Sequence, residues 1–172
     1  MSLKGLDSAV ILSAVRTPIG RFRSALAPVP AAELGATVVR MAVERAALPD
    51  LADIDEVLMG NVVSAGLGQN IARQSAIFGG LPSTVGATTI NKVCGSSLKA
   101  VMLAAQAIRA KDGNLFVVGG VESMSQAPHL LEGRMDQLRY GNAGLRDALL
   151  VDGLWCAFED WVMGEAAEFI AD

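Results

Sequence analysis

Residues 91–108 read NKVCGSSLKAVMLAAQAI and carry the strongest helical pattern of the chain. Apolar side chains recur there at spacings of three and four, which is typical of a helix with one apolar face and predicts a helix over residues 95–110. The preceding run TTIN, residues 88–91, is β-branched and predicts a strand. Cys94 therefore stands where a strand gives way to the N-terminus of a helix.

This junction can activate a thiol or simply bury it. The first N–H groups of a helix lack intrahelical partners and carry partial positive charge, which favours a thiolate and can stabilise the oxyanion of a thioester under attack. Gly95 allows a ligand to approach the backbone, and Ser96 and Ser97 can satisfy donors of the first turn. A small packing cysteine suits the same place, so position alone leaves both readings open.

The elements on either side of this stretch predict the fold class. Short apolar runs at 9–14, 54–59 and 115–118 read as strands, and residues 31–46 and 70–78 read as helices. The resulting order β-α-β-α-β-α-β predicts an α/β fold with a mostly parallel sheet covered by helices. After Gly120 buried strand runs cease, so we expect one α/β domain over 1–120 and the beginning of a second unit over 121–172.

Composition narrows the class of protein. Hydrophobic residues make up 52% and charged residues 19%, which indicates either a membrane protein or a surface that a partner covers. No run approaches the roughly 18 apolar residues of a membrane span, so we expect no membrane. A net charge of −4 argues against nucleic acid. Two distant cysteines form neither a disulfide framework nor a metal cluster, so we expect no metal and a cytoplasmic protein.

Five segments in order resemble the thiolase family. They are VILSAVRTPIGRF at 10–22, GNVVSAGLGQNIARQSAIFGGLP at 60–82, the stretch around Cys94, GNLFVVGGVESMSQAPHLL at 113–131, and MGEAAE at 163–168. The resemblance implies the layered thiolase fold, with residues 1–120 as most of the N-terminal half. Residues 121–172 then correspond to the start of an inserted loop domain, and the final strand of the first half is missing.

The resemblance also implies an acyl-CoA acyltransferase. In the family the cysteine at the position of Cys94 takes an acyl group from an acyl-CoA thioester, for condensation or for thiolytic cleavage of 3-ketoacyl-CoA. Leu154 and Met163 match positions that contact the pantetheine arm and the acyl end, although core packing also explains them. By resemblance we expect coenzyme A thioesters as substrates without a further cofactor, a homodimer or tetramer, and a place in fatty acid metabolism.

The proton chemistry of thiolases has no match in this sequence. The family uses a histidine in a Gly-His-Pro motif and a second cysteine in a Cys-Gly pair. Gly-His-Pro does not occur in this sequence, and its only Cys-Gly pair is that of Cys94 itself. The single histidine, His129, follows a proline and is a poor candidate for the base, and Cys156 lies among apolar residues. Two alternatives therefore stand: a structural half or split subunit that needs a C-terminal partner chain, or a related ketoacyl-synthase-like condensing enzyme.

Overall fold

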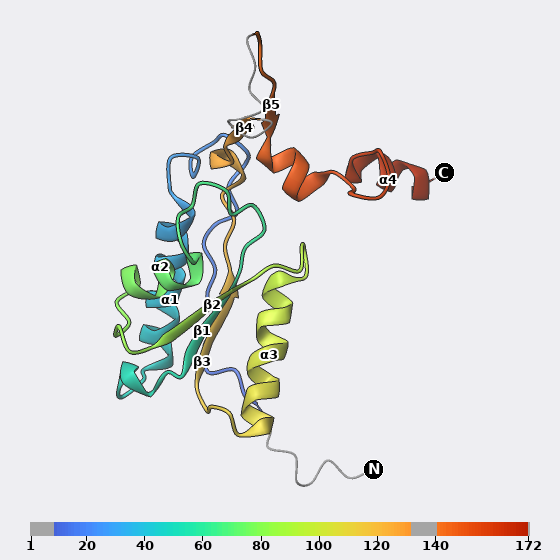
Figure 1. The fold of residues 1–172 in the computed structure, drawn as a ribbon. Helices are drawn as coiled ribbons and strands as arrows, with labels where there is room; N and C mark the ends of the chain where they lie inside the picture. Colours follow the sequence, from blue (N-terminus) through green and yellow to red (C-terminus); the bar gives the residue numbers. More distant parts are fainter. Residues whose placement is uncertain (1–8, 132–140, 172) are drawn as a thin grey trace, which may run out of the picture.

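The computed structural model describes residues 9–131 and 141–171, and a three-stranded parallel sheet lies at their centre (Figure 1). The strands are β1 (Glu56–Gly60), β2 (Gly86–Ile90) and β3 (Phe116–Gly120), in the order β2-β1-β3. Leu58 of β1 is in register with Thr88 on one side and Val118 on the other. The prediction of a parallel sheet is thus confirmed for three of the four predicted strands, those at 54–59, 88–91 and 115–118.

Helices cover both faces of this sheet. The helices α1 (Ala31–Ala46) and α2 (Ile71–Phe78) lie on one face and α3 (Ser96–Ala110) on the other, which gives three layers (Figure 1). Each begins and ends within one residue of the bounds predicted from the sequence. The α/β fold class is therefore confirmed.

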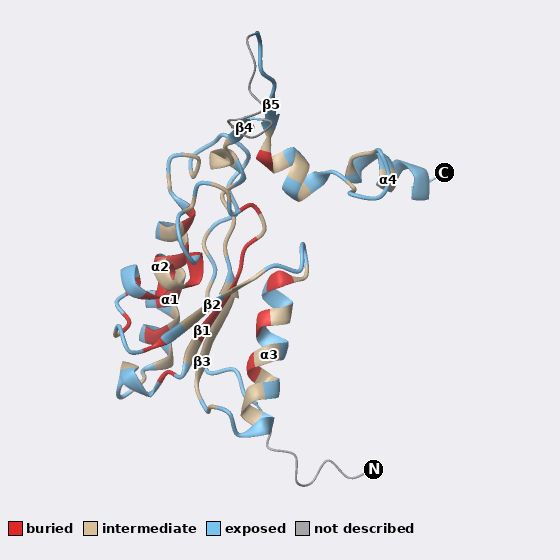
Figure 2. Ribbon diagram, viewed as in Figure 1, coloured by how far each residue is buried: buried red, intermediate tan, exposed pale blue. Residues whose placement is uncertain are grey.

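The main core lies between the sheet and the helices α1 and α2. Alternation along β1 directs Val57 and Met59, 0% and 1% exposed, toward this side. Figure 2 shows the buried residues concentrated there. The other buried members of this core are Val39, Val43, Ile54, Ala72, Ala76, Leu81 and Val85.

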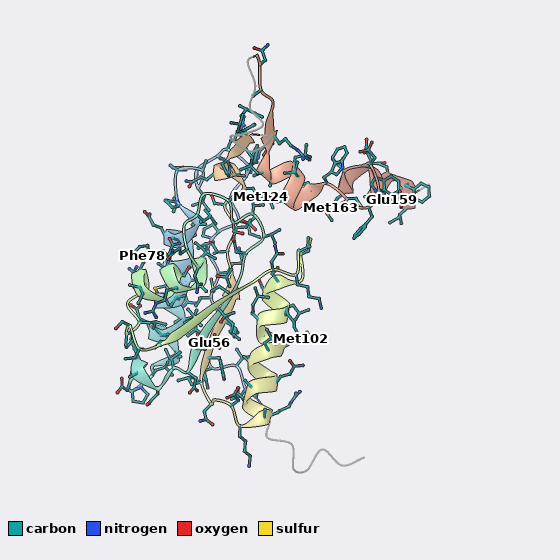
Figure 3. All side chains as sticks on the ribbon, in the orientation of Figure 1. Glu56, Phe78, Met102, Met124, Glu159 and Met163 are labelled. Carbon is teal, nitrogen blue, oxygen red and sulfur yellow. The ribbon has the colours of Figure 1, made fainter. Side chains whose placement is uncertain are left out.

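The opposite face is packed differently. Leu58 meets the small residues Ala100 and Ala104 of α3, so this helix lies close to the sheet. Two large apolar residues of α3 point elsewhere: Leu98 is 66% exposed, and Met102 lies on the side away from the sheet (Figure 3). The sequence pattern predicted the helix but not which face would meet the sheet.

The predicted strand at 9–14 is wrong. These residues belong to no strand in the described part of the chain, and Val10 and Ile11 are 73% and 81% exposed. A cavity of about 410 Å³ lies between this segment and β3, while Ser13 Oγ donates to Ala42 O of α1 at 2.8 Å. A strand exists through hydrogen bonds to a neighbour, and across this cavity the segment has none.

A carboxylate ties the start of β1 to the start of β3. Asp55 Oδ2 accepts hydrogen bonds from Asn114 N at 2.6 Å and Leu115 N at 2.9 Å. These two backbone donors hold the pKa of Asp55 below its ordinary value, and slight burial opposes them.

The C-terminal part extends from the sheet as smaller elements (Figure 1). Strands β4 (His129–Leu131) and β5 (Leu145–Asp147) pair antiparallel, and the π-helical turn η4 (Leu150–Leu154) and helix α4 (Met163–Ala171) follow. Two 3-10 turns, η1 (Leu51–Asp53) and η2 (Met124–Gln126), complete the elements of the described residues. The division of the chain at residue 120 stays a prediction. None of the described helices has the length and apolar character to span a membrane.

Candidate functional site

Cys94 lies in the tight turn that joins β2 to α3, at the end of the sheet where the parallel strands finish. Its side chain is exposed and its thiol is free. Gly95 caps α3 without a side-chain hydrogen bond to the helix. The structure confirms that this cysteine lies between the end of a strand and the start of a helix. Its thiol is accessible rather than packed in a core.

The backbone of this turn is strained next to the thiol. Val93 has φ 48°, a left-handed conformation that a β-branched residue adopts very rarely. Its N–H donates to Asn91 Oδ1 at 3.0 Å, so the turn is held from the strand side. Such strain persists only where surrounding interactions impose it.

Ser96 holds the same turn from the helix side. Its side chain is buried, and its Oγ accepts from Lys92 N at 2.9 Å and donates to Val93 O at 2.5 Å. Ser96 thus satisfies a donor of the loop before Cys94 and not the donors of the first helical turn that the sequence suggested. The reason is that its hydroxyl faces back across the turn.

Two glycines let the first turn of α3 rest directly on the sheet. A side chain at Gly60, the last residue of β1, would bring a Cβ within 2.7 Å of Ser96 Cβ and of Ser97 N. At Gly120, the last residue of β3, a Cβ would lie 2.0 Å from Ser97 Oγ. The two strands therefore end in glycine because the helix that begins beside Cys94 leaves no room for a side chain. Sequence reasoning missed this role, although both strand patterns visibly end in glycine.

A second polar cluster fixes the ends of β1 and β3 to each other. Glu122 Oε2 accepts from Val62 N at 2.9 Å and from Val63 N at 3.3 Å, and Oε1 accepts from Asn61 Nδ2 at 3.0 Å. Asn61 Nδ2 also donates to Val121 O at 3.1 Å, while its buried Oδ1 has no hydrogen-bond partner among the residues that the structure describes. Nothing in the sequence distinguished this carboxylate, because its partners are mostly backbone N–H groups.

The two predicted substrate residues lie together in the C-terminal part. Leu154 ends the π-helical turn and is 36% exposed, and Met163 begins α4 and is 47% exposed. Figure 3 shows Met163 on the segment that extends from the sheet. No hydrogen bond of the described residues joins this segment to the turn at Cys94. Their contact with a substrate stays a prediction.

The remaining candidates have structural surroundings. His129 is exposed on β4, and Cys156 Sγ accepts from Glu159 N at 3.4 Å. Trp161 packs against Phe169 with ring centroids 5.6 Å apart and ring planes tilted by 51°. Arg73 donates to Val85 O at 2.5 Å and Ser83 O at 2.8 Å, which ties α2 to the loop before β2. Within residues 9–131 and 141–171, no three His, Cys, Asp or Glu side chains gather as metal ligands do.

Comparison with known proteins identifies the family. The family model described as "Thiolase, N-terminal domain" matches residues 9–172. An acetyl-CoA acetyltransferase of Cupriavidus necator is 53% identical over 167 residues, and a probable acetyl-CoA acetyltransferase of Escherichia coli K12 is 51% identical over 166 residues. Each alignment covers 96% of this chain and 42% of the relative, so the chain spans about two fifths of these proteins.

A solved structure agrees with the sequence relatives. The crystal structure of Acat5 thiolase from Ascaris suum in complex with coenzyme A superposes with a TM-score of 0.86 at 44% identity. The superposition covers 94% of this chain and 41% of that one. Fold, sequence and family model agree over nearly the whole length. The chain therefore belongs to the thiolase family and corresponds to its N-terminal domain.

Proposed function

We propose that this chain supplies the acyl-carrying cysteine of an acyl-CoA acyltransferase of the thiolase class, and that Cys94 is that residue. The observation that carries the proposal is an exposed thiol on a strained, tightly held turn at the start of α3, in a chain that matches the thiolase N-terminal domain. Relatives about half identical to this chain carry the name acetyl-CoA acetyltransferase, which favours coenzyme A thioesters as the substrates.

The chemistry is a transfer of the acyl group between sulfur atoms, followed by formation of a carbon–carbon bond. The Cys94 thiolate attacks the carbonyl carbon, and the C=O electron pair moves to oxygen, where the Cys94 backbone N–H is one proposed donor. When the pair returns, the bond to the CoA sulfur breaks, and CoA takes up a proton. A base, proposed to come from the further polypeptide, removes an α-proton from a second acyl-CoA. The resulting carbanion attacks the acyl carbon, the bond to the cysteine sulfur breaks to release the thiolate, and thiolysis is the reverse.

Leu154 and Met163 are proposed to contact the substrate. Both are partly exposed apolar side chains within ten residues of each other, which suits the pantetheine arm and the acyl end of the substrate. Val162 stands directly before Met163, where short-chain biosynthetic members commonly carry histidine by the resemblance noted above. We infer no acyl-length preference for that reason. No cofactor beyond coenzyme A thioesters enters this proposal.

The activity is proposed to need further polypeptide. His129 is exposed on β4, and Cys156 Sγ accepts a hydrogen bond from Glu159 N. Among the described residues, no hydrogen bond joins either of them to Cys94, so neither is proposed as the base or the second thiol. Leu98, Val101 and Met102 also leave an apolar stripe on α3 uncovered. These features favour a half-site that docks on a complementary chain. By the resemblance to thiolases we further propose a cytoplasmic homodimer or tetramer active in fatty acid metabolism.

The test is thiolysis of acetoacetyl-CoA, measured by its loss in the presence of coenzyme A. The chain is assayed alone and with a complementing chain, defined as the C-terminal part of the Cupriavidus necator relative beyond the matched region. We expect thiolysis with the complementing chain, abolished by Cys94→Ser and kept by Cys156→Ser. Activity that survives Cys94→Ser contradicts the assignment. Activity of the chain alone contradicts the need for further polypeptide.

A further inference from the structure

Val93, in the turn before Cys94, has an energetically unfavourable backbone conformation, and two neighbouring side chains stabilise it. Val93 holds φ 48° although the residue is 50% exposed. The side-chain groups that contact the turn are Asn91 Oδ1 on Val93 N–H and Ser96 Oγ on Val93 O and Lys92 N. Backbone hydrogen bonds from Gly95 N to Lys92 O at 3.0 Å and from Ser96 N to Val93 O at 3.1 Å also close the turn. Without the side-chain hydrogen bonds we expect the valine to relax to a negative φ.

Relaxation at Val93 would redirect the next residue. Cys94 is covalently adjacent, and a change of φ at Val93 rotates the peptide plane that carries the Cys94 N–H. The other end of the turn cannot follow, because α3 is fixed against Gly60 and Gly120. The direction of the thiol and of its backbone N–H therefore depends on the conformation of Val93.

We propose that Ser96, assisted by Asn91, is a positioning residue that holds Val93 in its left-handed conformation and so presents the Cys94 thiol for reaction. The proposal rests on the role of Cys94 proposed above. Ser96 touches neither substrate nor the reacting atoms, and acts through the backbone of residues 92 and 93. Ser97, its neighbour in the same helical turn, has no hydrogen bond from its hydroxyl among the described residues and provides a matched control.

The experiment measures alkylation of Cys94 by iodoacetamide at fixed pH, with Cys156 of the same molecule as the internal reference. Peptide mass spectrometry gives the ratio of the two rates, and circular dichroism gives the thermal midpoint of every variant. We expect Ser96→Ala to lower the Cys94 to Cys156 ratio on the order of tenfold, because the thiol loses its presented geometry. Ser97→Ala is expected to stay within about twofold.

Rescue separates positioning from general destabilisation. Glycine adopts a positive φ without strain, so Val93→Gly makes the side-chain hydrogen bonds unnecessary. The double variant Ser96→Ala with Val93→Gly is expected to recover most of the lost ratio. An unchanged ratio in Ser96→Ala, or a double variant no faster than Ser96→Ala, overturns the proposal.

A second pair keeps the test decisive if Ser96→Ala does not fold. Asn91 is exposed, and Asn91→Ala removes the acceptor of Val93 N–H without opening the core. We expect a smaller fall in the ratio, again restored by Val93→Gly, and no fall would overturn the proposal. Because alkylation needs no acyl-CoA, a positive result here combined with failed thiolysis rejects the proposed function and keeps the positioning role.

Discussion

The two faces of the sheet are built from the same strands but covered in different ways. On one face, α1 and α2 bury Val57 and Met59 completely within a large apolar core. On the other face, α3 meets Leu58 through Ala100 and Ala104, and turns Leu98 and Met102 outward. The first face stabilises the fold by burial. The second brings a helix N-terminus close to the sheet and leaves the thiol beside it accessible.

The largest effect is expected from a matched pair of methionines. Met59, 1% exposed, packs between the sheet and the α1–α2 layer, so Met59→Ala should lower the free energy of unfolding by about 2–5 kcal/mol. Met102→Ala removes the same atoms from a side chain 45% exposed on α3, and a change of roughly 0.5 kcal/mol or less is expected. Urea unfolding of both variants measures the difference. Equal losses would show that the two faces are equally packed.

The next effect concerns the close approach of α3 to the sheet. Gly60→Ala places a Cβ 2.7 Å from Ser97 N, a backbone atom that cannot move without the helix, so overpacking should cost about 1–3 kcal/mol. The same variant should slow alkylation of Cys94 relative to Cys156. Gly164→Ala in α4 meets nothing within 4 Å and should be neutral or stabilising by up to about 1 kcal/mol. A tolerated alanine at residue 60 would refute the tight contact.

A smaller effect is expected at Asp55, which joins the first residues of β1 and β3. Asp55→Ala removes the acceptor of two backbone donors and should cost about 1–2 kcal/mol at neutral pH. Asp53→Ala, without such bonds in the described residues, should change stability by roughly 0.5 kcal/mol or less.

The Asp55 contribution should also depend on pH. Its pKa in the folded state lies below the ordinary value of 3.8, so its stabilisation is present above that value and is lost as the pH falls through the folded pKa. Urea unfolding at neutral and acidic pH measures it. The difference between wild type and Asp55→Ala should shrink in acid, and a difference that grows there would contradict the assigned cause.

The smallest effect on the chain itself is expected at Leu98. This side chain is 66% exposed on α3, so Leu98→Gln should change the free energy of unfolding by roughly 0.5 kcal/mol or less. In the complemented thiolysis assay the same variant should lose activity, since a polar group then faces the docking chain. Full activity would show that the apolar stripe of α3 is no docking surface.

Much of the fold followed from the sequence because periodicity reports local structure. The bounds of α1 followed from its apolar spacing after Pro30, and the junction at Cys94 followed from a β-branched run before a helical one. The strand predicted at 9–14 failed because a strand needs a hydrogen-bonding neighbour, which no local pattern reports. The sequence did not predict the outward orientation of Leu98 for a similar reason: the apolar face of a helix does not show which element packs against it.

The finer parts of the site arise from contacts between distant residues. Gly60 and Gly120 reveal their role only when α3 is laid across the strand ends, and Ser96 only when its hydroxyl is seen to face back toward Val93. The resemblance to thiolases, carried by five segments in order, was confirmed by the family model and the relatives. It singled out Cys94 as the candidate nucleophile but did not indicate how the turn around it is held.

The central claim is that the thiol of Cys94, at the start of α3, carries the acyl group. The most direct measurement is intact and peptide mass spectrometry after mixing the chain with acetyl-CoA, with and without the complementing chain. The account predicts one acetyl group on Cys94, removed by hydroxylamine and absent in Cys94→Ser but present in Cys156→Ser. An acetyl group found elsewhere, or none on Cys94 in a complemented mixture that catalyses thiolysis, would contradict it.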